Sequence, residues 1–299
     1  MQYADVMQKF ADRHALNGLT ENSIKHLYDG DFSLDRANDF IDFYRRLETE
    51  LLTHPVITDN PYTRWFKKGD ITDGDVRHLI VQFSVFTNQF LVAQVQKMIS
   101  AHNLEEMRAT KEILANEIGV IFRDPSKGRE PISAGSGASF SGSVEGGIFH
   151  FSAAHFESLV RLADHIGLRF DELGRREHGT PTTLFFCDEL IRLYGSSDYA
   201  TCEAASFAVE HWGAAGFWRE LIQGLECYKQ RDNVDMPLGF FTWHDRLKDN
   251  HARHTREELE NYYFTHNVDE KLFIDKGSEM LDGVYAFWKG LDDDHRRLH

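Results

Sequence analysis

The chain has 299 residues, of which 41% are hydrophobic and 27% are charged, and its formal net charge is −15. This charge argues against a nucleic-acid partner, because phosphate binding needs a concentrated basic surface. Cys187, Cys202 and Cys227 have no C-x-x-C spacing, which argues against a disulfide framework. No apolar run approaches the length of about 18 residues that indicates a membrane span. The sequence therefore predicts a cytoplasmic protein with no membrane partner.

Apolar residues recur at offsets of three and four through most of the chain, which predicts a mostly helical protein. The expected helices cover residues 4–15, 34–52, 74–102, 104–122, 181–194, 199–229, 237–266 and 270–291, with one more inside 148–166. Asp73 is predicted to cap the helix over 74–102, and the helix inside 148–166 is predicted to begin near Ser152. No segment shows sustained alternation, so no strand is expected.

Residues 123–147 differ from the rest of the chain in composition. They read RDPSKGREPISAGSGASFSGSVEGG, with six glycines and six serines. Such a segment buries little apolar surface, so a mobile loop is expected. A lid over a binding site and a tolerated surface insertion are both compatible with this composition.

Three ionisable residues lie inside apolar helical runs. Glu117, His155 and Glu210 each occupy a different predicted helix. A buried carboxylate must be paired or metal-bound, because burying a bare charge is costly. Any one of them alone is more commonly a partnered residue than a ligand. Their shared occurrence on separate helices indicates a site built in the core of a bundle.

A pair of histidines completes this pattern. His244 and His251 are seven positions apart, so on a helix they lie on one face and can bind one metal ion together. Lys248 lies between them on the same face. His254 and Glu258 extend the same helix, and one of them could supply a substitute ligand in a shifted register. The favoured interpretation is that they belong to a solvated helix end.

In their order, these residues resemble the haem-oxygenase-like di-iron oxidases and oxygenases, relatives of the thiaminase-type and pyrroloquinoline-quinone-synthase-type bundles. The matching elements are NEIG at 116–119, AHFESL at 154–159, Glu210, the pair His244 and His251, and MLDGVYAFWKGL at 280–291. The resemblance covers roughly residues 55–292. Each motif is weak alone, and their common order carries the resemblance.

The resemblance implies an all-α, haem-oxygenase-like helical bundle over residues 55–299. Residues 1–54 have no match and are expected to form an N-terminal helical extension that packs on the bundle or on a neighbouring subunit, which leaves a homodimer open. The implied activity is that of an iron-dependent oxidase or oxygenase that uses O₂ on a small-molecule substrate. The implied iron ligands are Glu117, His155, Glu210, His244 and His251.

The chain departs from the family pattern at two places. In the family, an Asp lies between the two histidines that correspond to His244 and His251, whereas this chain has Lys248 there. A lysine ammonium repels a second iron ion. The family's first Glu is also missing, because residues 76–104 contain no Asp or Glu. Asn88, Gln89 and Gln94 are the nearest polar candidates. The sequence therefore predicts one iron ion, with a second site that is weak or absent.

These departures leave two alternatives open. The protein could be a metal-free or metal-depleted relative that binds or oxidises a small molecule. In that case Lys248, the catalytic candidate, replaces the metal charge through a salt bridge to Glu210 or Glu117. The other alternative is a non-catalytic helical partner protein.

Overall fold

The structure is a computed structural model that describes residues 2–121, 140–144, 147–151 and 155–298. The side chains of residues 2–4, 105, 109, 112, 116, 121, 140–151, 247–254 and 298 lie outside this description. The elements are α1 (Gln2–His14), α2 (Glu21–Asp29), α3 (Leu34–Arg46), the π-helical turn η1 (Leu47–Leu51), α4 (Pro55–Thr58), α5 (Pro61–Phe66), α6 (Asp73–Ile99), α7 (Leu104–Glu117), β1 (Val120–Ile121), β2 (Phe140–Val144), β3 (Gly147–Phe151), α8 (His155–His165), the 3₁₀ turns η3 (Phe170–Glu172) and η4 (Arg176–His178), α9 (Pro181–Glu189), the π-helical turn η5 (Leu190–Tyr194), α10 (Tyr199–Ala214), α11 (Phe217–Asp232), α12 (Gly239–Thr265) and α13 (Glu270–Leu298).

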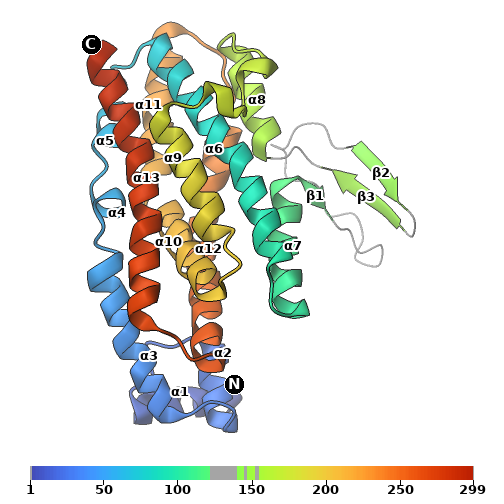
Figure 1. The fold of residues 1–299 in the computed structure, drawn as a ribbon, viewed down its shortest axis with the longest axis vertical. Coiled ribbons are helices and arrows are strands. Elements are labelled where there is room, and N and C mark those ends of the chain that lie inside the picture. Colours follow the sequence, from blue (N-terminus) through green and yellow to red (C-terminus); the bar gives the residue numbers. More distant parts are fainter. Residues whose placement is uncertain (1, 122–139, 145–146, 152–154, 299) are drawn as a thin grey trace.

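The long helices form one bundle that runs the length of the molecule (Figure 1). α13 packs along α10 and α9, α12 packs on α10, and α6 packs against α7 and α9. Phe83 on α6 lies at the centre of an aromatic interior. Its ring contacts the rings of Phe86, Trp218, Phe240, Phe241, Phe287 and Trp288. The prediction of an all-α bundle is confirmed for this main body.

Local sequence explains where two of these helices begin and end. The Thr72 side chain accepts a hydrogen bond from the Asp75 amide, and the Asp75 carboxylate accepts one from the Thr72 amide. This capping box places the start of α6 at Thr72, so the predicted Asp73 cap is wrong by one residue. The single helix predicted over 199–229 is divided at Gly216, whose φ of +87° favours glycine.

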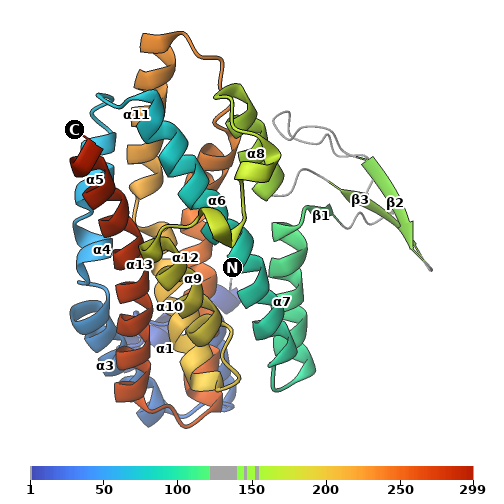
Figure 2. The same cartoon turned by 45° about the horizontal axis from the view of Figure 1, so that its top comes forward.

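A small antiparallel sheet occupies part of the predicted loop. β3 is its central strand, and Phe151 pairs with Val120 of β1 and with Phe140 of β2. The sheet projects from the side of the bundle, beyond α7 and α8 (Figures 1 and 2). The expectation of no strand is therefore wrong here, because these short Gly- and Ser-rich strands lack clear alternation. The remaining loop residues, 123–139 and 145–146, lie outside the described part.

The sheet also adjoins the ends of two predicted helices. α7 ends at Glu117, five residues before its predicted end at 122, because β1 follows at once. β3 ends at Phe151 and α8 is described from His155, so the predicted helix start near Ser152 lies outside the described residues. Glu117 and His155 are therefore the last residue of one helix and the first residue of another, on either side of the sheet.

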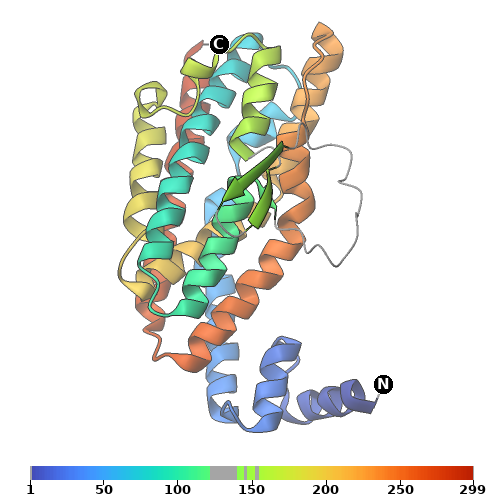
Figure 3. The same cartoon turned by 90° about the vertical axis from the view of Figure 1, so that its right-hand side faces the viewer.

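The N-terminal helices α1, α2 and α3 pack on one end of the bundle (Figure 3). The Thr20 hydroxyl donates to the carboxylate of Glu260 on α12 at 2.5 Å, and Glu260 is fully buried. Nε of Arg36 donates to the carbonyl of Tyr263 at 3.0 Å. Short helices such as α2 and α5 were not expected from the sequence, since they hold too few residues for a clear period. Within the described ranges, every helix is too short or too polar to span a bilayer.

Candidate metal and substrate site

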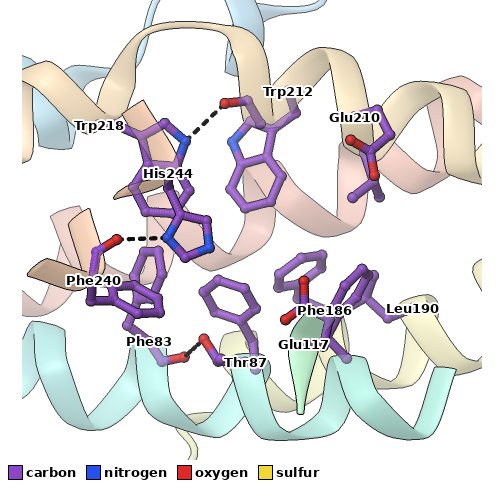
Figure 4. A pocket seen from close by; sticks show the side chains of 14 residues that line it. Phe83, Thr87, Glu117, Phe186, Leu190, Glu210, Trp212, Trp218, Phe240 and His244 are labelled. Carbon is purple, nitrogen blue, oxygen red and sulfur yellow. Dashed lines mark hydrogen bonds between the residues drawn. The ribbon is translucent and has the colours of Figure 1, made fainter. Parts of the chain in front are cut away.

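A pocket of about 120 Å³ lies inside the bundle, between α6, α10 and the first turns of α12. It is lined by Phe83, Phe86, Thr87, Phe90, Glu117, Phe186, Leu190, Val209, Glu210, Trp212, Gly213, Trp218, Phe240 and His244. Half of the lining residues are Phe or Trp, and the ionisable residues in the wall are Glu117, Glu210 and His244 (Figure 4). Three of the five predicted ligands, which come from α7, α10 and α12, therefore share one pocket.

His155, the fourth predicted ligand, touches this group from α8. Its Nδ1 lies 2.8 Å from Oε2 of Glu117, and its ring centroid lies 4.8 Å from that of His244. Both members of the His155–Glu117 contact are largely buried, with side chains 13% and 18% exposed. The contact thus joins the two helix ends on either side of the sheet, and it brings an imidazole and a carboxylate together at the pocket.

The His155–Glu117 contact lacks the direction of a hydrogen bond. Nδ1 of His155 is shielded from solvent and has no hydrogen-bond partner among the described residues. Metal ions bind imidazole nitrogen and carboxylate oxygen at about 2.0–2.2 Å, so two neighbouring ligand atoms of one ion lie about 3 Å apart. The two side chains therefore fit a site in which one cation holds both.

His244 is fixed in one tautomer and orientation. Its Nδ1 lies 2.7 Å from the carbonyl oxygen of Phe240, which can only accept, so Nδ1 carries the proton. Nε2 is then the nitrogen with a lone pair, as a metal ligand requires. The Trp218 ring stacks on the imidazole at 4.6 Å with 20° between the planes. This arrangement resembles the backbone support that orients metal-binding histidines.

The remaining predicted residues, His251 and Lys248, lie in α12 with His244, but their side chains fall outside the description. The helix confirms the backbone spacing on which their common face was predicted. In the described part of the chain, no group of three His, Cys, Asp or Glu side chains is arranged to hold a metal ion. The five-residue ligand set and the role of Lys248 remain predictions.

The aromatic wall was missed by the sequence analysis, although a signal for it was present. Phe83, Phe86 and Phe90 are spaced three and four residues apart in α6, so they line one face of that helix. Between them, Thr87 is the polar residue that α6 contributes to the pocket, and its hydroxyl donates to the Phe83 carbonyl at 2.9 Å. This face of α6 therefore supplies mainly apolar surface, and no carboxylate, to the pocket.

The polar residues considered as replacements for the missing Glu have other partners. Asn88 donates to the carbonyl of Gly174 at 2.9 Å, and Gln94 donates to the hydroxyl of Tyr194 at 2.6 Å. Gln89 does not line the pocket either. On α6, the described side chains therefore provide no anionic ligand for a second metal ion.

A second polar cluster lies on α10, within two turns of Glu210. Nζ of Lys97 lies 3.3 Å from Oε1 of Glu203 and 2.8 Å from Oγ of Ser206. Glu258 of α12 is exposed as predicted, yet partial burial of its carboxyl raises its pKa to about 7. Lys97 opposes this rise, and Glu203 and Glu210 add to it. The segment predicted as a solvated helix end lies within α12, which continues to Thr265, so that expectation is wrong, and the Glu258 carboxyl is electrostatically coupled to the interior.

Comparisons with known proteins identify the fold. No protein-family model matches the chain, and no curated protein matches it. A domain of unknown function with a haem-oxygenase-like fold from Shewanella denitrificans aligns over 85% of this chain and 93% of its own, with TM-score 0.57 and 14% identity. A CADD-like protein of unknown function from Nostoc punctiforme aligns over 88% and 99%, with TM-score 0.55 and 14% identity. The chain has the haem-oxygenase-like helical fold.

Proposed function

We propose that this protein is an iron-dependent, O₂-activating oxidase or oxygenase that acts on a small molecule. The observation that carries the proposal is the meeting of Glu117, Glu210 and His244 in one pocket, with His155 in contact with Glu117. Imidazole and carboxylate ligands with an open position are typical of non-haem iron sites that react with O₂. The aromatic remainder of the wall suits a small, largely apolar substrate.

Each group has a distinct role in this proposal. Glu117, His155, Glu210 and His244 would hold the iron, with His251 as the fifth ligand. The bound iron would supply the binding and reduction of O₂. The carbonyl of Phe240 holds the proton of His244 on Nδ1, so the imidazole keeps its lone pair on Nε2. The aromatic residues exclude water and hold the substrate against the ligand side of the pocket.

The test is anaerobic titration of the purified, chelator-treated protein with Fe(II), followed by measurement of O₂ uptake. The wild-type protein is expected to bind about one tightly held iron ion per chain, and His155→Gln or Glu117→Gln should weaken binding at least about tenfold, since even indirect support of a ligand has such an effect. His165→Gln and Glu157→Gln are the matched controls, because both residues are exposed on the same helix as His155. The controls should bind iron as the wild type does.

Two results would contradict the proposal. One is a wild-type protein that binds no Fe(II), and the other is equal binding by the ligand and control variants. In the first case, the metal-free alternative with Lys248 as the replacing charge is favoured, and retention of small-molecule binding in the iron-free protein would support it.

A further inference from the structure

Two tryptophans in the pocket wall differ in how their indole N–H groups are used. Trp218 donates its Nε1–H to the carbonyl of Gly213 at 2.8 Å. Trp212 is 5% exposed, and its Nε1 is buried without an acceptor among the residues that the structure describes. Figure 4 shows this nitrogen on the edge of the indole that faces Trp218 and His244. The pocket therefore contains one satisfied and one unsatisfied indole donor.

The Trp212 ring is held in place by its neighbours. It stacks on Phe217 at 5.0 Å with 11° between the planes. The Phe86 and Phe186 rings make T-shaped contacts with it, with ring centroids 6.1 and 5.9 Å away. Such packing prevents the indole from turning toward another acceptor. Because a buried donor without a partner is unfavourable, an acceptor that enters the pocket gains a preset hydrogen bond.

The chemistry of the wall restricts what that acceptor can be. An indole N–H only donates, so the ligand must present an oxygen or nitrogen lone pair. Glu117 and Glu210 line the same pocket, so an anionic ligand is repelled when no metal compensates their charge. A neutral carbonyl satisfies both conditions. The rest of the wall is mainly aromatic and aliphatic, which favours a flat apolar group.

The size of the pocket sets the scale of the ligand. Its volume is about 120 Å³. An apolar cavity of about 150 Å³ in another protein binds benzene, so this pocket matches a ligand with a single ring. We propose that the pocket binds a neutral aryl carbonyl compound, whose carbonyl oxygen accepts a hydrogen bond from Nε1 of Trp212 while its ring packs against Phe86 and Phe186. This inference rests on the proposed function only in taking the pocket as the substrate site, because the binding itself needs no iron.

The experiment compares three probes of similar size on chelator-treated, full-length protein by isothermal titration calorimetry. Acetophenone has the carbonyl, ethylbenzene has a methylene in its place, and benzoate carries a negative charge. Acetophenone should bind tightest, and Trp212→Phe should weaken it about tenfold while changing ethylbenzene binding less than about twofold. Trp288→Phe is the control, because its Nε1 is also buried without an acceptor in the described part of the chain but the residue does not line the pocket, and it should leave the preference for acetophenone over ethylbenzene unchanged.

Each outcome decides the proposal. Failure of the wild type to bind either neutral probe, or tighter binding of benzoate, would overturn the ligand class. Equal effects of Trp212→Phe on acetophenone and ethylbenzene would overturn the donor role of Trp212. If Trp212→Phe does not fold, the wild-type indole N–H resonances decide instead: acetophenone, but not ethylbenzene, should move one of them downfield. A protein that binds acetophenone as described but no iron would refute the proposed function and leave this inference standing.

Discussion

Lys97 on α6 and Glu203 on α10 form an ion pair inside the bundle, with Nζ and Oε1 3.3 Å apart and side chains 11% and 13% exposed. Nζ also donates to Oγ of Ser206. Burial has the largest single effect on Lys97 and opposes its charge, but Glu203 and the neighbouring groups together outweigh it and hold the pKa of the lysine well above its usual value. The pair therefore joins the helix that carries the aromatic wall to the helix that carries Glu210.

Removing the positive member of this pair should destabilise the protein. Lys97→Met leaves Glu203 charged, largely buried and without its cation, which costs about 3–5 kcal/mol when a buried pair is broken on one side. Urea unfolding followed by circular dichroism measures the effect. The double variant Lys97→Met/Glu203→Gln should recover much of the loss, since no unpaired charge remains. An equally unstable double variant would show that packing of the lysine stem, rather than its charge, holds the helices.

The pKa of Glu258 predicts a pH dependence of stability. A glutamate in the unfolded chain titrates near about 4.3, whereas partial burial raises the pKa of Glu258 to about 7 in the folded protein. Between these values the folded state binds more protons than the unfolded state, so this group lowers the unfolding free energy as pH rises through the window. Glu258→Gln should remove that decline. At pH 8 the unfolding free energy of Glu258→Gln should exceed that of the wild type by about 1 kcal/mol. This value is reduced for solvent screening, because the side chain is exposed.

Unfolding in urea at a series of pH values from 5 to about 8 tests this prediction. Glu48→Gln is a suitable control, because Glu48 is exposed and belongs to η1, away from the Lys97 cluster. The control should keep the wild-type slope. If the unfolding free energy of Glu258→Gln varies with pH as that of the wild type does, then the Glu258 carboxyl of the wild type titrates as an ordinary exposed glutamate.

Close approach of α11 to α5 predicts a size limit at Gly224. A Cβ atom there would lie 2.3 Å from the backbone oxygen of Phe66, so Gly224→Ala requires the helices to separate. Overpacking of this kind costs about 1–3 kcal/mol, measured as a fall in unfolding free energy. Gly213→Ala is the comparison, because no atom lies within 4 Å of its added Cβ and alanine favours the helix. Its unfolding free energy should stay the same or rise, and a similar loss in both variants would exclude the steric explanation.

The charge at position 248 predicts the metal stoichiometry. Lys248→Asp replaces a positive charge by an anionic group between His244 and His251, so binding of a second iron ion should strengthen. The ratio of iron to protein after anaerobic loading and desalting measures the change. Lys248→Met is the control, because it removes the positive charge without adding a ligand. Two tightly held ions in the wild-type protein would show that Lys248 does not oppose the second one.

The sequence was most informative where an ionisable side chain occurred at a position set by the helical repeat of apolar residues. Glu117 and Glu210 stood out as carboxylates inside apolar helical runs, and His244 stood out by its spacing from His251; all three share one pocket. The division of α10 from α11 was missed, since apolar spacing continues across Gly216 and only the backbone angle marks the break. The unsatisfied donor of Trp212 could not be predicted either. It depends on which acceptor the folded chain brings near the indole, and a sequence does not contain that distance.

The pairing of Val120 with Phe151 and the His155–Glu117 contact hold together the two ends of the segment that connects α7 to α8. The entropy of closing a loop rises slowly with its length, by about 0.6 kcal/mol for each doubling. A chain anchored in this way can gain or lose many residues at the far side of the anchor without much loss of stability. The bundle could therefore carry an additional folded module at this position, grafted within a few residues of its candidate ligands.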